Sequence, residues 1–286
     1  MMTDISVVIP TYNRAATITH AIESVMLQDG ANEYFRIAEI IVIDDCSDDN
    51  TAEVLTEFKK KNLPNMLLQG DGTKDQVTQI VYHKLDKNGG PGKARNEGVK
   101  LAKSEWVAFQ DSDDLWHSNK LKEMITFMGN SPEADLYSHF YEAKLDVGRC
   151  ITVDAPQLDD YFSELAKRNL VGAPTILVRK SSFMDIVGFD EEMRALEDWD
   201  FALRFAYKYK IMFVPKVLMS VDLTGEGVSS KAGNYYDARC RLIAKNKNAL
   251  IERGVFKDAV EKLLNDALEK GILKEVGAVL ESYLVV

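Results

Sequence analysis

Neighbouring carboxylates in the segment Asp111–Asp114 are the first feature of this 286-residue sequence that could do chemistry. Asp111 and Asp113 are two positions apart and follow an apolar run, so strand alternation would put both on one side of the chain. Two such carboxylates raise each other's pKa unless a cation lies between them. Mg²⁺ and Mn²⁺ prefer hard oxygen ligands and usually take one or two carboxylates together with phosphate oxygens. The segment is therefore a candidate cation site, and the alternative is a solvated acidic loop that caps the next helix.

Two further pairs of adjacent acids stand at the boundary of a strand or a helix. Asp44-Asp45 ends an isoleucine-rich run, where a carboxylate could accept a hydrogen bond from a base N–H or a ribose hydroxyl, or could cap a helix. Glu197-Asp198 opens a predicted helix, where acids also complement the helix dipole. One of these two carboxylates could instead act as a general base on a hydroxyl group. Because adjacent helical positions point about 100° apart, the two cannot face the same site.

A glycine-rich segment, Asn88–Asn96, combines a flexible backbone with two cations, Lys93 and Arg95, and the start of a helix. Helix amino termini favour anions, so this segment could bind phosphate. It matches neither the GxGxxG pattern nor a Walker loop. The alternative is a glycine-rich turn followed by a solvated basic helix face.

The elements that would position these clusters alternate between strand and helix in the first half. Four strands are expected: Ile5–Ile9, Glu39–Ile43, Thr78–Leu85 and Trp106–Gln110. The first is a short apolar run that ends at Pro10. Helices are expected between and after them, over Ile18–Met26, Ala52–Lys61, Lys93–Ala102 and Leu121–Met128. This rhythm predicts βαβ units and a mainly parallel, Rossmann-like α/β sheet flanked by helices. Ligands of such sheets bind at the carboxyl ends of the strands. Four polar clusters are expected at these ends: Thr11–Arg14, Asp44-Asp45, Asn88–Asn96 and Asp111–Asp114.

The second half has a looser rhythm. We expect strands at Ala173–Arg179, Ile211–Val214 and Lys216–Val221, and helices at Ser181–Val187 and Glu197–Tyr209. A loop at Thr224–Ser230 precedes three expected helices, Tyr235–Glu252, Lys257–Lys270 and Leu273–Leu284. The sequence thus predicts a main unit of residues 1–230 and a small C-terminal helical appendage of residues 231–286.

Composition narrows the possible partners and location. The net charge is −10, from 45 acidic and 35 basic residues. The overall electrostatic field therefore does not favour binding of nucleic acid. A nucleotide ligand, itself an anion, would need local cations. Three widely spaced cysteines, no basic-then-apolar amino terminus and no apolar run of ~20 residues predict a cytoplasmic protein. The appendage carries four cations interleaved with apolar residues: Arg239, Arg241, Lys245 and Lys247. These cations could contact the inner face of an anionic cell membrane, or they could form a solvated helix face.

The clusters, taken in order, resemble the family 2 glycosyltransferases, which have the GT-A fold. The matching segments span roughly residues 5–225: Ser6–Arg14, Ile41–Ser47, Asn88–Gly98, Phe109–Asp114, Gly188–Glu191 and Glu197–Asp200. The resemblance implies an inverting, metal-dependent enzyme that moves a sugar from a nucleotide-diphosphate donor, expected to be a UDP-sugar. It divides the GT-A domain into a nucleotide-sugar-binding half (1–115) and an acceptor-binding half (116–230).

The resemblance also assigns roles to positions of this sequence. The nucleotide-sugar would be bound by a set drawn from each cluster: Pro10, Thr11, Tyr12, Arg14, Asp44, Asp45, Lys93, Arg95, Asp111 and Ser112. Asp113 would be the principal ligand of Mn²⁺ or Mg²⁺, with Asp111 beside it. Asp198 would be the catalytic base, with Glu197 next to it. The acceptor, a saccharide or a lipid-linked saccharide in bacterial surface polysaccharide or glycoconjugate synthesis, would bind near Val171–Thr175 and the Thr224–Ser230 loop.

Two other classes of function share some of these features. A nucleotidyltransferase also uses an α/β sheet, Mg²⁺ and a glycine-rich basic loop, but its glycines are expected directly after the first strand, where this chain has Thr11–Arg14. A non-catalytic binding module would keep the fold without turnover, and the presence of both Asp113 and Asp198 argues against it.

Overall fold

The computed structural model describes residues 2–68, 78–146, 149–222 and 232–284. Its first half contains the four predicted strands, β1 (Thr3–Thr11), β2 (Phe35–Asp44), β3 (Gln79–Lys84) and β4 (Trp106–Phe109). They lie side by side in the order β3-β2-β1-β4, and all three pairings are parallel. The helices between and after them are α1 (Ile18–Met26), α2 (Thr51–Leu68), α3 (Pro91–Leu101) and α4 (Lys120–Asn130). The predicted βαβ organisation of this half is confirmed.

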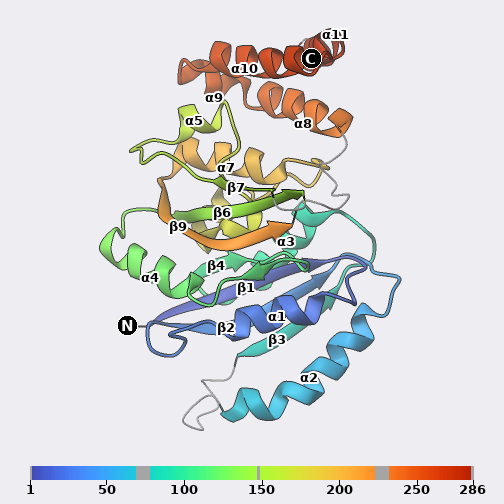
Figure 1. The fold of residues 1–286 in the computed structure, drawn as a ribbon, viewed down its shortest axis with the longest axis vertical. Coiled ribbons are helices and arrows are strands. Elements are labelled where there is room, and N and C mark those ends of the chain that lie inside the picture. Colours follow the sequence, from blue (N-terminus) through green and yellow to red (C-terminus); the bar gives the residue numbers. More distant parts are fainter. Residues whose placement is uncertain (1, 69–77, 147–148, 223–231, 285–286) are drawn as a thin grey trace.

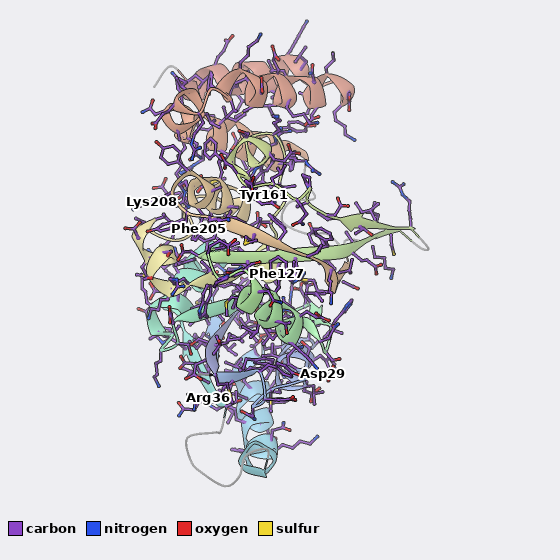
Figure 2. All side chains as sticks on the ribbon, turned by 90° about the vertical axis from the view of Figure 1, so that its left-hand side faces the viewer. Asp29, Arg36, Phe127, Tyr161, Phe205 and Lys208 are labelled. Atoms are coloured by element: carbon purple, nitrogen blue, oxygen red, sulfur yellow. The ribbon has the colours of Figure 1, made fainter. Side chains whose placement is uncertain are left out.

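The second half extends the same sheet with mixed pairings. Its strands are β5 (Leu115–Trp116), β6 (Leu136–Asp146), β7 (Arg149–Val153), β8 (Leu177–Arg179) and β9 (Ile211–Asp222). β8 joins β4 antiparallel, β6 follows β8, and β9 runs parallel to β6. Over the described residues this gives one sheet of nine strands. Figure 2 shows the β6–β7 hairpin projecting from the body of the molecule.

Prolines explain three differences from the predicted strands. β1 continues through Pro10 to Thr11. The pairing of β1 with β4 ends at Val8, so Pro10 pairs only with β2, and a strand that is paired on one side tolerates a proline. Residues expected as two strands around Pro215 form the single strand β9, with a register shift where Pro215 has no N–H to donate. The first part of the expected Ala173–Arg179 strand is instead the 3₁₀ turn η2 (Ala173–Thr175), which contains Pro174.

Side chains from both faces of the sheet are buried, which is why its strands read as continuous apolar runs. On one face, β1 residues such as Val7 pack with α1 and α4 residues such as Ile22 and Leu121. On the other face, Val8 belongs to a core that includes α3 and α7 (Glu197–Lys208) and continues into the C-terminal helices. Two short helices, α5 (Phe162–Leu165) and α6 (Lys180–Asp185), complete this side.

The C-terminal helices are α8 (Ala232–Lys245), α9 (Lys247–Glu252), α10 (Phe256–Glu269) and α11 (Leu273–Leu284). They stack on the α7 side of the molecule, at the end opposite α2 (Figure 1). The helix expected at Tyr235–Glu252 is broken at Asn246, which separates α8 from α9. The loop expected at Thr224–Ser230 lies outside the described residues. None of the helices described is both long enough and apolar enough to cross a bilayer.

Three of the four cations expected to form a membrane-facing or solvated surface on the C-terminal helices are paired within the protein. Arg239 is buried against Asp266, at 2.7 Å. Arg241 pairs with Glu192 at 2.5 Å, and Lys245 pairs with Asp190 at 2.7 Å. Because these side chains face acids of the protein, they do not form a free basic patch.

Candidate active site

The loop after β1 and the loop after β2 are joined by hydrogen bonds at the carboxyl edge of the sheet. Asn13 donates its backbone N–H to the Ser47 hydroxyl at 2.9 Å and accepts from the Asp48 N–H at 3.0 Å. The Arg14 N–H donates to the Thr51 hydroxyl at 3.3 Å. Asn13 adopts a φ of 53°, a left-handed conformation that asparagine tolerates better than most residues. Two clusters predicted to converge from the sequence therefore form one surface.

Asp44 lies under this surface, fully buried at the end of β2. One carboxylate oxygen accepts the Ser47 N–H at 2.7 Å, and the other accepts the Tyr82 hydroxyl of β3 at 2.6 Å. Burial, with the Asp44 carboxylate next in effect, raises the pKa of Tyr82, so this hydroxyl stays a donor. Asp44 thus holds the loop after β2, and both of its carboxylate oxygens accept hydrogen bonds from within the protein.

Asp45 fastens the glycine-rich loop to the sheet edge. Its two carboxylate oxygens accept the backbone N–H groups of Gly89 and Gly90, each at 2.7 Å. Burial raises the pKa of Asp45, while these two amides and the charge of Lys93 lower it. Gly90 has a φ of 87°, which glycine adopts without steric cost, and Pro91 then begins α3. The predicted contact of Asp45 with a base would have to share oxygens already used by the loop.

Arg95 is buried between two carboxylates rather than exposed on the glycine-rich loop. Nη2 lies 2.7 Å from Asp111 Oδ1, and Nη1 lies 2.8 Å from Glu197 Oε1. Desolvation would lower the pKa of the guanidinium, but the charges of Asp111 and Glu197 more than offset it and hold the pKa above its ordinary value. Arg95 therefore links the loop after β4 to the first turn of α7. Of the two cations predicted to flank a base or diphosphate, Lys93 has the more accessible side chain.

The acidic loop after β4 concentrates negative charge. Asp113 is about half exposed and pairs with Arg14 at 3.1 Å, whereas Ser112 is buried. Burial and repulsion from Asp111 and Asp113 raise the pKa of Asp114 to about 8. Among the residues described, no three His, Cys, Asp or Glu side chains are placed to hold a metal ion. The carboxylates of this loop are hard oxygen donors, the ligand type that Mg²⁺ and Mn²⁺ prefer, so these residue types fit a divalent cation.

Asp198 and Glu197 begin α7 after Leu196, which has a left-handed φ of 60°. Glu197 is engaged by Arg95, as described above, whereas Asp198 Oδ1 accepts the Trp199 N–H at 2.7 Å and faces the Asn169 amide at 3.4 Å. Burial, followed by repulsion from Glu197, raises the pKa of Asp198 to about 7, against the opposing charge of Arg95. This is the range in which a carboxylate works well as a general base near neutral pH.

Three residues that the sequence did not single out also border the site. Asn169 contacts Asp198, and Tyr141 of β6 lies near both Asp198 and Asp114, whose charges add to burial in raising the pKa of its hydroxyl to about 12. Lys120 is buried, donates to the Pro174 carbonyl at 2.5 Å and lies 3.9 Å from the Trp116 ring centroid. No motif marked Tyr141 or Asn169. The only sequence signal that could have pointed to Lys120 is its place at the start of a helix, six residues after the acidic loop.

Comparison with known proteins places this geometry in a family. The family model "Glycosyl transferase family 2" matches residues 6–184. The chain belongs to this family. An uncharacterized glycosyltransferase of Rickettsia felis is 31% identical over 227 residues, which cover 78% of this chain and 33% of that protein. The chain thus spans about a third of the length of the first curated relatives that it matches.

Solved structures show the same fold. Staphylococcus aureus TarS residues 1–349 in complex with UDP-GlcNAc align with a TM-score of 0.69 at 25% identity, covering 94% of this chain and 73% of that chain. The mannosyltransferase PcManGT from Pyrobaculum calidifontis, in complex with GDP-Man and Mn²⁺, aligns with a TM-score of 0.64 at 17% identity, covering 100% and 76%. The predicted GT-A fold is confirmed. The individual site residues remain predictions.

Proposed function

We propose that this chain is an inverting glycosyltransferase that moves a sugar from a nucleotide-diphosphate donor to an acceptor hydroxyl. The observation that carries the proposal is the buried Arg95 bridge. It ties Asp111, in the predicted cation loop, to Glu197, beside the predicted base. Asp111 and Glu197 are 86 positions apart in the sequence, and both carboxylates bind the same guanidinium. This supports a single site in which the donor is activated and the acceptor is deprotonated.

The donor side of the site is supplied by the carboxyl ends of β1, β2 and β4. Asp113 and Asp111 would hold Mg²⁺ or Mn²⁺ together with the diphosphate, and Arg14, which neutralises Asp113 here, would be displaced toward a phosphate. The bound cation would supply the charge neutralisation that lets the nucleoside diphosphate leave. Tyr12, in the loop after β1, is 46% exposed, so its ring could stack on the base.

The acceptor side of the site is supplied by Asp198. Its carboxylate would take the proton of the acceptor hydroxyl while the hydroxyl oxygen bonds to the anomeric carbon and the carbon–oxygen bond to the diphosphate breaks. Attack from the face opposite the leaving group would convert an α-linked donor into a β-glycoside. Asn169, the Ala173 backbone and the Trp199 N–H surround the carboxylate, which supports a fixed orientation.

We further propose a UDP-sugar as donor and a saccharide or lipid-linked saccharide as acceptor. TarS, which is named a poly(ribitol-phosphate) β-N-acetylglucosaminyltransferase, is solved with UDP-GlcNAc, and this supports a donor of that class and a role in surface-polymer synthesis. The Mn²⁺ in the PcManGT complex supports metal dependence. In this proposal residues 1–115 bind the donor, residues 116–230 bind the acceptor, and residues 231–286 form the appendage.

Thermal shift measurements test donor and metal binding together. UDP with Mn²⁺ should raise the melting temperature, and Asp113→Ala should abolish the gain, because the cation would lose its principal ligand. Asp159→Ala changes an exposed acid that belongs to none of the predicted site positions, so it is the matched control and should keep the gain. A panel of nucleotide-sugars, scored by donor hydrolysis, would then identify the donor. Unchanged melting with UDP, GDP and dTDP, each with metal, would overturn the proposal.

A further inference from the structure

The carboxylate of Asp200 is fully buried two positions after Asp198. Oδ2 accepts from Arg204 Nε at 2.7 Å and from Lys245 Nζ at 3.0 Å, and Oδ1 accepts from Asn246 Nδ2 at 3.0 Å. Arg204 lies one turn further along α7, whereas Lys245 is the last residue of α8 and Asn246 follows it. A buried carboxylate needs such partners, so the first turn of α7 is fixed partly by the C-terminal helices.

Lys245 and Arg204 also hold the segment that leads into α7. Lys245 Nζ pairs with Asp190 at 2.7 Å. The Arg204 guanidinium donates to the carbonyls of Ile186 and Gly188, each at 2.7 Å. This segment ends at Leu196 in its left-handed conformation, which persists only where surrounding contacts enforce it. The same cations therefore stabilise both the helix start and the strained residue before it.

The residue between Asp198 and Asp200 is held in a similar way. The Trp199 indole N–H donates to the Leu165 carbonyl at 2.6 Å, and the Arg239 guanidinium of α8 lies 5.2 Å from the centroid of the Trp199 ring. Arg239 is in turn fixed by Asp266 of α10 at 2.7 Å. The ring is thus confined between α5 and α8.

Helix geometry connects these contacts to the base. Positions two apart on a helix point about 200° apart, so Asp200 and Asp198 lie on nearly opposite sides of α7. Anchoring Asp200 on the side of the C-terminal helices therefore sets the rotation of the turn and the direction of Asp198 on the other side. A catalytic group must lie within hydrogen-bond reach of its proton, and a displacement of about 1 Å can cost ~10²-fold in rate.

We propose that Lys245, Asn246 and Arg239 are positioning residues, which act through Asp200 and Trp199 to aim the Asp198 carboxylate at the acceptor hydroxyl. This inference rests on the proposed glycosyl transfer and gives the C-terminal helices a part in it. It assigns these three residues no contact with donor, acceptor or metal.

The test compares two variants with matched controls in the full-length chain. Lys245→Met and Asn246→Ala should each lower kcat for transfer about tenfold. The KM and Kd for the donor should stay within about twofold, because the donor loops are untouched. Lys257→Met and Asn248→Ala, at exposed positions on α10 and α9, should behave as wild type. Lys245→Arg keeps the cation and should restore most of kcat.

Hydrogen exchange separates positioning from global instability. In Lys245→Met and Asn246→Ala, amide exchange should rise over residues 189–203 and stay at wild-type levels in β1 and β2. Wild-type kcat in both variants, or exchange that rises equally throughout the chain, would overturn the positioning role. An inactive wild type across the whole donor panel would instead overturn the proposed function, and this inference with it.

Discussion

At the scale of single residues, the two adjacent acids that open α7 have different partners. Glu197 is neutralised by Arg95, so its carboxylate is committed to an ion pair. Asp198 forms no ion pair with any residue that the structure describes, is only partly exposed and has its pKa raised to about 7. Two carboxylates with similar sequence context thereby acquire different surroundings, and the raised pKa of Asp198 suits it to exchange a proton near neutral pH.

The pH dependence of kcat/KM should report the titration of Asp198. A base acts in its deprotonated form, so activity should be constant above about pH 7 and fall about tenfold per pH unit below it.

Asp198→Asn should keep donor binding and lose about 10²–10⁴-fold in transfer, measured by product formation and by donor titration. Asp159→Asn is the exposed control. A flat profile between about pH 5 and pH 8, or full activity in Asp198→Asn, would assign the base elsewhere.

At the scale of elements, α3 and the segment before α7 are joined by Asn96. Its amide donates to the Phe189 carbonyl at 2.9 Å, and its oxygen accepts the Phe189 N–H at 2.9 Å. Gly188 precedes this contact with a φ of 64°, and a Cβ there would lie 2.5 Å from the Asn96 oxygen and 2.6 Å from the Phe183 ring. The Gly-Phe-Asp-Glu segment recognised in the sequence thus has a structural reason: it docks on the helix that carries Arg95.

Replacing Gly188 should therefore disrupt this contact. We expect Gly188→Ala to lower the free energy of unfolding by roughly 1–3 kcal/mol, from the positive φ and the overlap with Asn96 and Phe183, measured by urea denaturation. Gly277→Ala, in α11 with open space around the new Cβ, should instead be neutral or stabilising by about 0.5–1 kcal/mol. Equal stability of the two variants would show that the docking contact is not tight.

At the scale of the whole molecule, the described C-terminal helices share a core with the sheet. Leu242 of α8, Leu263 of α10 and Leu280 of α11 belong to the same cluster of buried side chains as Val8 of β1 and Phe205 of α7. Ion pairs and hydrogen bonds from α8 to the α7 region reinforce the contact. The cluster predicts that the main unit depends on the appendage for its stability.

Truncation after residue 230 tests this dependence. It would leave the buried Asp200 carboxylate with Arg204 as its remaining described partner and uncover apolar surface of α7. We expect a loss of about 3–5 kcal/mol or more, seen as a lower melting temperature by circular dichroism and as binding of a hydrophobic dye. A truncated chain that melts cooperatively at the wild-type temperature would show that residues 1–230 are an independent unit.

Local sequence determined the parallel half of the sheet and the places where chemistry could occur. Runs such as Ile40–Ile43 predict buried strands because both faces of the sheet are covered, and a polar residue directly after such a run must lie at the sheet edge. The sequence therefore placed Asp44 and Asp113 at the carboxyl edge of the sheet, whereas Asp198 was noted as one of two acids that open a helix. The roles of all three stay predictions. The β6 strand was missed, since buried polar residues such as Ser138 and His139 interrupt its apolar pattern.

Tertiary structure decided which partner each charged side chain takes. The sequence assigned Arg95 to nucleotide-sugar binding, and only the fold shows that its guanidinium lies between Asp111 and Glu197. It placed Arg239 and Lys245 on a free helix face, but the fold pairs them with Asp266, Asp190 and Asp200. A charge pairs with whatever lies within a few ångströms, and contacts between distant segments leave no local pattern. The residue types of the acidic loop were thus fixed locally, whereas its electrostatic environment was set by side chains far away in the sequence.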